Sequence, residues 1–199
     1  MFFRNFAIRM VYVDDHIWDF DLDAALNVIS EQRREQALRF KFELGRRQSV
    51  LAYLLLKRAL LREYGIAENP LFTYGEHGKP SIVGHPDIHF NLSHCREAVA
   101  CAVDNVPVGI DVESVRPLKE SLARYTMSES ELQLIHSADD PALAFTRFWT
   151  MKEACLKLTG EGLRDRMAMV LDAPSCVFET VVSANGKYVY SLCKSASRR

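Results

Sequence analysis

The sequence has little of several features that would each point to a specialised class of protein. It contains 9 glycines and 7 prolines among 199 residues, which excludes a collagen-like or low-complexity chain. Its longest purely apolar run, Val50–Leu56, is far shorter than the roughly 20 residues of a membrane span. Neither sign of charge dominates, because 25 basic and 26 acidic side chains give a formal net charge of −1. We therefore expect a globular protein that binds neither membranes nor nucleic acid.

Cysteine is also scarce, and its spacing predicts free thiols. The five residues are Cys95, Cys101, Cys155, Cys176 and Cys193. Their number is odd and no two are spaced as CxxC, so we expect reduced, mostly buried thiols in a cytoplasmic protein rather than a disulfide framework. The N-terminal segment carries Arg4 and Arg9 within its apolar stretch and has no small-residue cleavage site. It therefore lacks the pattern of a signal peptide.

Hydrophobic periodicity and turn signals predict two similar halves, 1–105 and 106–199, each with strands and one long amphipathic helix. In the first half we expect strands at Ala7–Val13, 71–75, 87–94 and 97–104, and a helical region at Ser30–Tyr64 that is broken near Gly45. In the second half we expect a strand at 107–115, a short helix opened by the capping box Ser128–Glu131, a helix at Pro141–Thr159 and a terminal hairpin around Asn185-Gly186. The fold class is therefore α+β.

The strand expected at 107–115 alternates cleanly between apolar and acidic side chains. Asp111 and Glu113 leave one face, whereas Val108, Ile110 and Val112 leave the other. Two carboxylates so close together repel unless a cation lies between them, and oxygen ligands suit a hard ion such as Mg²⁺. The alternative is a solvated outer face of an edge strand, which this pattern taken alone favours.

The helix expected at Pro141–Thr159 places Glu153 and Lys157 four residues apart, on the same face as Trp149. Lys152 is adjacent in sequence but points about 100° away around the helix axis. Taken alone, this spacing favours an ion pair on the helix surface rather than a site.

Four of the six histidines lie between residues 77 and 94, but their spacing does not favour zinc. His85 and His89 are four apart in a strand-like segment, without an accompanying cysteine pair. Ser93 and His94 are neighbours on an expected strand, so their side chains leave opposite faces and cannot form a nucleophile–base pair. We expect both to be polar ligand contacts.

Two sets of cations suit an anionic ligand. Lys79 lies in a Gly/Pro turn, although Thr73 and Pro80 occupy positions where a P-loop needs Gly and Ser or Thr, which excludes a P-loop NTPase. Residues 30–65 carry nine basic and four acidic side chains, a local excess of +5. Most of these are expected to form a solvated helix face, but the excess could also meet an anionic ligand or an acidic partner.

Four short motifs occur in order within residues 78–163. They are GKP at 78–80, FNLSH at 90–94, GIDVE at 109–113 and WTMKEACLKLTGEGL at 149–163. Together they resemble the 4′-phosphopantetheinyl transferase superfamily, and the chain length resembles its Sfp-like, pseudodimeric branch. The family pattern WxxKExxxKxxGxGL is matched in full by Trp149, Lys152, Glu153, Lys157, Gly160, Gly162 and Leu163. The resemblance covers about residues 30–165.

The resemblance implies two similar α+β halves related by a pseudo-twofold, with the active site in the cleft between them. It also implies transfer of 4′-phosphopantetheine from coenzyme A to a serine of an acyl or peptidyl carrier protein, with release of adenosine 3′,5′-bisphosphate. The family motifs assign Mg²⁺, held against the coenzyme A pyrophosphate, to Asp111, Glu113 and Glu153. They assign coenzyme A contacts to Arg47 (or its neighbour Arg46), Lys79, Pro80, Ser93, His94, Asp111, Lys152 and Lys157.

Two catalytic roles follow from this implied reaction. A carrier serine is a weak nucleophile that needs a base, for which Glu153 is the best candidate, directly or through a water held by the metal. Lys157 would offset charge on the leaving phosphate. The alternative is a non-catalytic coenzyme A or carrier-protein binding module, which would not need three clustered carboxylates. We expect a monomer, because both halves lie in one chain.

Overall fold

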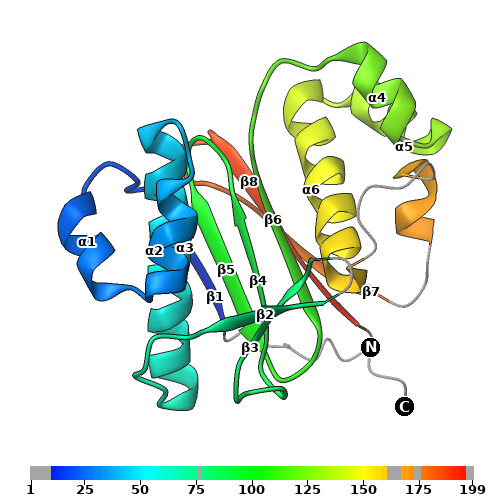
Figure 1. Cartoon of the computed structure of the whole chain (residues 1–199). Helices are drawn as coiled ribbons and strands as arrows, with labels where there is room; N and C mark the ends of the chain where they lie inside the picture. Colours follow the sequence, from blue (N-terminus) through cyan, green and yellow to red (C-terminus); the bar gives the residue numbers. More distant parts are fainter. Residues whose placement is uncertain (1–9, 76–77, 161–166, 173–175, 196–199) are drawn as a thin grey trace.

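The computed structural model describes residues 10–75, 78–160, 167–172 and 176–195. Two three-stranded antiparallel sheets occupy the middle of the molecule, with helices on either side of them (Figure 1). The first half contains β1 (Val11–Asp14), α1 (Leu22–Val28), α2 (Glu31–Leu38), α3 (Glu43–Tyr64), β2 (Phe72–Tyr74), β3 (Pro80–Ile82), β4 (His89–His94) and β5 (Val99–Asp104). The second contains β6 (Val108–Ser114), α4 (Glu120–Thr126), α5 (Glu129–Ser137), α6 (Pro141–Thr159), the 3-10 helix η1 (Met167–Asp172), β7 (Cys176–Val182) and β8 (Tyr188–Ser195). The expected α+β class is confirmed.

The two halves repeat one topology. Each begins with a strand, continues through three helices of which the third is the longest, and ends in a pair of antiparallel strands. In each sheet the last strand lies between the other two, in the orders β1-β5-β4 and β6-β8-β7. Helix α3 packs against the first sheet and α6 against the second (Figure 1). The small β2–β3 pair is an addition to the first half.

Most helix ends follow the expected signals, with two corrections in the first half. Helix α6 begins at the Asp140 cap, whose side chain accepts from the Leu143 amide, and ends at Gly160 with a φ of 74°. The break expected near Gly45 instead falls at residues 39–42, and Gly45 lies inside α3. Helix α1 was not expected at all. The first strand begins at Val11, while the earlier part of the predicted strand is outside the described residues.

The halves share an apolar core through the two faces of β5. Val99, Cys101 and Val103 pack on the α3 side. The alternating alanines of the same strand face the second half and pack with the apolar side of β6. Because the residues of β5 are buried on both faces, the halves form one packed body. In the described part of the chain, no helix combines the length and apolarity needed to cross a bilayer.

Two side chains join the sheets along a seam between β4 and β6. Asn91 Oδ1 accepts from the Ile110 amide at 2.9 Å, and Ser93 Oγ accepts from the Val112 amide at 3.2 Å. The two strands therefore run parallel here, with side-chain oxygens in the places that carbonyl oxygens occupy in a continuous sheet. This seam brings the end of β4 beside the acidic strand β6.

Candidate active site

The acidic face of β6 lies under α6. Gly109, Asp111 and Glu113 face this helix, because the alternating apolar residues of the strand fill the shared core. Gly109 allows the close approach, since a Cβ there would lie 2.0 Å from the carbonyl oxygen of Ala154. Asp111 is only 3% exposed and Glu113 is half-buried. The alternative of a solvated strand face is therefore wrong.

Asp111 connects the two halves through hydrogen bonds. Its Oδ1 accepts from Lys157 Nζ on α6 at 2.6 Å and from Ser93 Oγ on β4 at 2.9 Å. Lys157 also donates to Ser93 Oγ at 2.9 Å, so it is turned inward rather than forming a helix-surface pair. Among the described residues, Asp111 Oδ2 is buried without a hydrogen-bond partner. A buried carboxylate oxygen in this state is destabilising, and it is an available ligand atom.

Two further carboxylates lie within electrostatic reach of Asp111. Burial and the charge of Asp111 raise the pKa of Glu113 to about 7. The same two causes raise the pKa of Glu153, which lies one turn before Lys157 on α6. Lys157 opposes both shifts without cancelling them. The site therefore gathers three acids around one lysine and favours an added cation.

These carboxylates have the chemistry that a hard divalent cation prefers, because all their ligand atoms are oxygens. The unpartnered Asp111 Oδ2 and the raised pKa values of the two glutamates show that the protein's own groups do not stabilise three negative charges here. Across the described residues, the ligand atoms of the three acids do not all lie within 4.8 Å of one another. At least one of the three side chains would have to move for all of them to meet one ion.

Lys152, to which the resemblance assigns a coenzyme A contact, lies on a different face of α6 from Lys157. It is fully buried and forms a 2.7 Å ion pair with Glu131 of α5. Its Nζ also donates to three backbone carbonyl oxygens, those of Thr126, Met167 and Ala168. Because α6 turns about 100° per residue, this neighbour of a site residue faces α4, α5 and η1 instead. Lys152 holds these elements together.

Lys79 and His94 approach the site from the first half. Lys79 Nζ donates to the carbonyl oxygens of Lys157 and Leu158 at 2.9 and 2.8 Å, so it caps the end of α6. Pro80 follows it as the first residue of β3. His94 ends β4 with its side chain exposed at the edge of the site, and desolvation by the surrounding protein together with the charge of Lys157 lowers its pKa. The imidazole is therefore mostly neutral at pH 7.

Arg47 is held by contacts within the first half. Its guanidinium donates to Glu43 and to the carbonyl oxygen of Phe20, and it lies 5.1 Å from the centre of the Trp18 ring. Arg46 donates to a backbone carbonyl of the loop before α3. Within the described ranges, neither guanidinium bonds to Asp111, Glu113 or Glu153, and which of the two meets a ligand stays a prediction.

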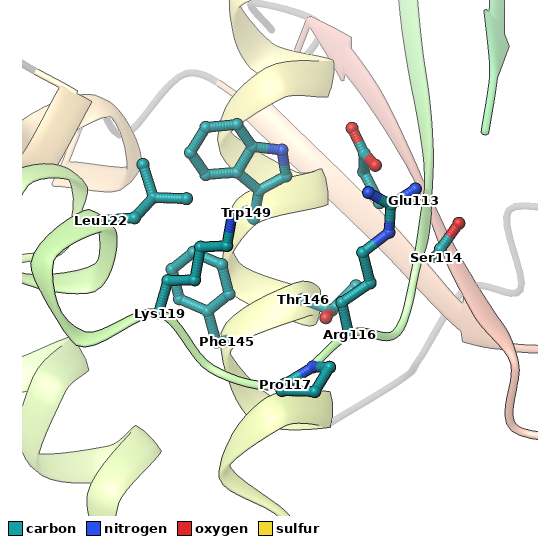
Figure 2. A pocket seen from close by; sticks show the side chains of 9 residues that line it. All are labelled: Glu113, Ser114, Arg116, Pro117, Lys119, Leu122, Phe145, Thr146 and Trp149. Atoms are coloured by element: carbon teal, nitrogen blue, oxygen red, sulfur yellow. The ribbon is translucent and has the colours of Figure 1, made fainter. Parts of the chain in front are cut away.

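A pocket of about 200 Å³ opens beside Glu113 (Figure 2). It is lined by Glu113, Ser114, Arg116, Pro117, Lys119, Leu122, Phe145, Thr146 and Trp149. The Phe145 and Trp149 rings, 5.9 Å apart, form an aromatic wall, and Figure 2 shows the Arg116 guanidinium directed toward Glu113. Sequence reasoning missed Arg116, Lys119 and Phe145, although the two cations directly follow the acidic strand.

Comparison with known proteins decides the family. A family model described as the 4′-phosphopantetheinyl transferase superfamily matches residues 107–196. The chain is 34% identical over 163 residues to the 4′-phosphopantetheinyl transferase psf-1 of Bacillus pumilus, covering 80% of this chain and 70% of that protein. This chain belongs to the 4′-phosphopantetheinyl transferase superfamily. The Sfp protein of Bacillus subtilis (strain 168) is 31% identical over 156 residues, which are 77% of this chain and 70% of that relative.

The family motifs can now be placed on this phosphopantetheinyl transferase. Asp111, Glu113, Glu153, Lys157 and Ser93 converge at the seam between β4, β6 and α6. Lys152 lies on the other side of α6. The final motif residues, Gly162 and Leu163, are outside the described residues.

Proposed function

We propose that the chain transfers 4′-phosphopantetheine from coenzyme A to a serine of an acyl or peptidyl carrier protein, in a Mg²⁺-dependent reaction that releases adenosine 3′,5′-bisphosphate. The observation that carries this proposal is the acidic cluster at the seam, where Asp111 Oδ2 is buried without a partner and the two nearby glutamates have raised pKa values. A module that only bound coenzyme A would gain nothing from gathering three acids beside a polyanion.

The cluster would hold the divalent cation. Asp111, Glu113 and Glu153 would supply its protein ligands, with Asp111 Oδ2 already directed away from the two donors that occupy Oδ1. When bound, Mg²⁺ neutralises pyrophosphate charge and so favours attack by an oxygen nucleophile.

Lys157 is suited to bind the leaving group, adenosine 3′,5′-bisphosphate. Its side chain is 30% exposed, and its ammonium donates to Asp111 and Ser93 from a flexible four-carbon stem. An incoming pyrophosphate oxygen can accept a hydrogen bond from one N–H of Lys157 while another N–H still donates to Asp111. Lys157 would then stabilise charge as it develops on the adenosine 3′,5′-bisphosphate.

Glu153 is suited to accept the proton of the carrier serine. Burial and Asp111 raise its pKa, which brings its basicity closer to neutral pH than that of an ordinary surface glutamate. It projects from the same helix as Lys157, one turn earlier, so both groups can meet one reacting phosphate. We assign Glu153 the role of general base.

The pocket beside Glu113 is suited to the uncharged pantetheine arm. Its aromatic wall of Phe145 and Trp149 offers apolar surface next to the acidic cluster. Arg116 and Lys119 lie at the same pocket and carry the charge that an arm phosphate or an acidic carrier surface would meet.

We extend the proposal to the architecture around the site. The halves 1–105 and 106–199 would be related by a pseudo-twofold, with coenzyme A in the cleft between them; the repeated topology supports this. One chain would suffice as a monomer, because β4 and β6 of the same chain supply the site. A cytoplasmic location is supported by the cysteines, whose number is odd and of which no two are spaced as CxxC.

The proposal is tested by the intact mass of an apo-carrier protein after incubation with the chain, coenzyme A and Mg²⁺. A gain of one phosphopantetheine group is expected, and the gain should disappear when a chelator replaces Mg²⁺. Binding of coenzyme A without any mass gain across a panel of carriers would instead identify a non-catalytic binding module.

Glu153→Gln tests the assigned base within the same assay. The variant keeps the shape of the side chain but loses its charge and basicity, so we expect a loss of at least about 10² in single-turnover rate. In chelator, coenzyme A binding should change little, because Glu153 is assigned to Mg²⁺ and to the serine proton rather than to coenzyme A itself. The melting temperature should not fall, because the folded protein disfavours the charged form of Glu153. A loss below about tenfold would show that Glu153 is only an acid on the helix surface and not the general base.

A further inference from the structure

Three of the five cysteines gather at one point beneath α6. Cys155 comes from α6, Cys176 is the first residue of β7, and Cys193 comes from β8. Their sulfur atoms all lie within 4.8 Å of one another, and the Cys155 and Cys176 sulfurs are 3.8 Å apart. Two of the thiols are buried, whereas Cys176 is partly exposed and offers a route of entry.

The fold explains why these thiols meet. Cys193 pairs with Gly109 across the sheet and therefore points toward α6, as Gly109 does. The missing side chain at Gly109 lets the helix lie against the strand, which carries Cys155 down onto β8. The register of β7 against β8 then places Cys176 at the same end of the sheet. Three separate elements thus each contribute one sulfur.

The spacing of the sulfurs suits a metal ion better than a disulfide. Zinc–sulfur bonds of about 2.3 Å give a sulfur–sulfur edge of about 3.8 Å in a tetrahedron, which is the separation of Cys155 and Cys176. The remaining pairs need a contraction of less than about 1 Å, by the same geometry. A disulfide would use two of the thiols and leave the third without a role.

The surroundings also suit a thiolate site. Cys155 and burial raise the pKa of Cys193, so the cluster without metal consists of neutral thiols. Burial lowers the pKa of Lys79, and a charged Cys193 would oppose this shift, so the ammonium lies within electrostatic reach of the Cys193 sulfur. Three thiolates and a divalent ion leave one negative charge, which Lys79 can balance. Among the described residues, no carboxylate or imidazole belongs to this cluster.

We propose that Cys155, Cys176 and Cys193 form a binding site for a thiophilic d¹⁰ metal ion, separate from the Mg²⁺ site. On binding, three metal–sulfur bonds form and three S–H protons go to solvent. Sulfur ligands select soft ions, whereas the all-oxygen acidic cluster selects hard ones. Zn²⁺ would take water as a fourth ligand at the exposed Cys176 side, whereas Cu⁺ would be held by the three sulfurs alone.

The test uses the full-length protein, freed of metal and kept reduced with a phosphine. Titration with Zn²⁺ and, under anaerobic conditions, with Cu⁺ is followed by mass and by thiolate-to-metal charge-transfer absorption, which carboxylates do not produce. We expect one thiolate-bound ion per chain and a rise in melting temperature. The ion that wins in a direct competition identifies the metal.

Cys176→Ser is the decisive variant, because this side chain is partly exposed and its change is least disruptive to folding. It should weaken binding at least tenfold and remove most of the absorption band. Cys101→Ala is the matched control, since Cys101 is buried in the first-half core away from the cluster. No charge-transfer band in the wild type, or an undiminished band in Cys176→Ser, would overturn the proposal and leave three core thiols.

Discussion

Glu113 holds a proton near neutral pH because burial and Asp111 both disfavour its charged form. Its folded pKa of about 7 lies above the ordinary value of 4.5. The folded state therefore binds the proton more tightly than the unfolded state, and the metal-free protein loses stability as pH rises from about 4.5 through about 7. A bound cation would remove this penalty.

We expect Glu113→Gln to raise the melting temperature of the metal-free protein, and to raise it more at pH 8 than at pH 5. The reason is that the penalty for ionising Glu113 is fully developed only above its folded pKa. The same variant should lose Mg²⁺-dependent transfer. Thermal unfolding in chelator at the two pH values, with the exposed Glu68→Gln as control, checks the prediction; equal melting shifts at both values would contradict it.

Helix α6 carries two lysines on different faces, one that stabilises the fold and one that belongs to the active site. Lys152 is buried against Glu131, and Lys157 reaches Asp111 at the seam. We expect Lys152→Met to lower the free energy of unfolding by about 3–5 kcal/mol, because it leaves a buried glutamate unpaired. Lys157→Met should also lower the free energy of unfolding, because it leaves buried Asp111 without its ion-pair partner, but unlike Lys152→Met it should cost about 10² or more in single-turnover rate.

Denaturant unfolding and single-turnover transfer, measured on both variants, separate the two roles. The rate per folded molecule of Lys152→Met should stay within tenfold of the wild type. A large rate loss in Lys152→Met at full folding would restore it as a coenzyme A contact, as its motif position implies.

The same helix shows what local sequence can and cannot predict. Its ends were predictable from Asp140, Pro141 and Gly160, because capping depends on near neighbours. The acidic face of β6 was predictable from alternation alone. Its burial was not, since exposure depends on α6, which packs there only because Gly109 lacks a side chain. The partner of Lys152 was equally hidden, because Glu131 lies 21 positions earlier on another helix.

On the scale of the whole molecule, charge is distributed unevenly although its sum is near zero. Part of the basic segment 30–65 lies near the site. Gln48 of α3 donates to the carbonyl oxygen of Cys95, which directly follows β4, so the first turns of α3 lie beside the end of β4. We expect the KM for an acidic carrier protein to rise with salt, as screened charge pairs weaken. Lys41→Glu, two residues before α3, should raise this KM several-fold at low salt.

Arg62→Glu is the matched control, because Arg62 lies about 21 Å further along α3 from Gln48, at 1.5 Å per residue. It should follow the wild type across the salt series. Steady-state transfer at varied carrier concentration measures all three proteins. A KM that does not change between low and high salt would point to an apolar docking surface instead.

The active site can come apart at the seam between β4 and β6 without either half unfolding. The amides of Ile110 and Val112 are bound by the side chains of Asn91 and Ser93, not by a neighbouring backbone. Such bonds can open without breaking a ladder, so hydrogen exchange at these two amides should be faster than at Cys101 in β5. Asn91→Ala should accelerate exchange at Ile110 alone. Every such opening would take Ser93 away from Asp111 and Lys157 while both sheets stay intact. The active site is therefore assembled only while the seam is closed, and the lifetime of the closed seam limits how long one molecule can catalyse transfer without interruption.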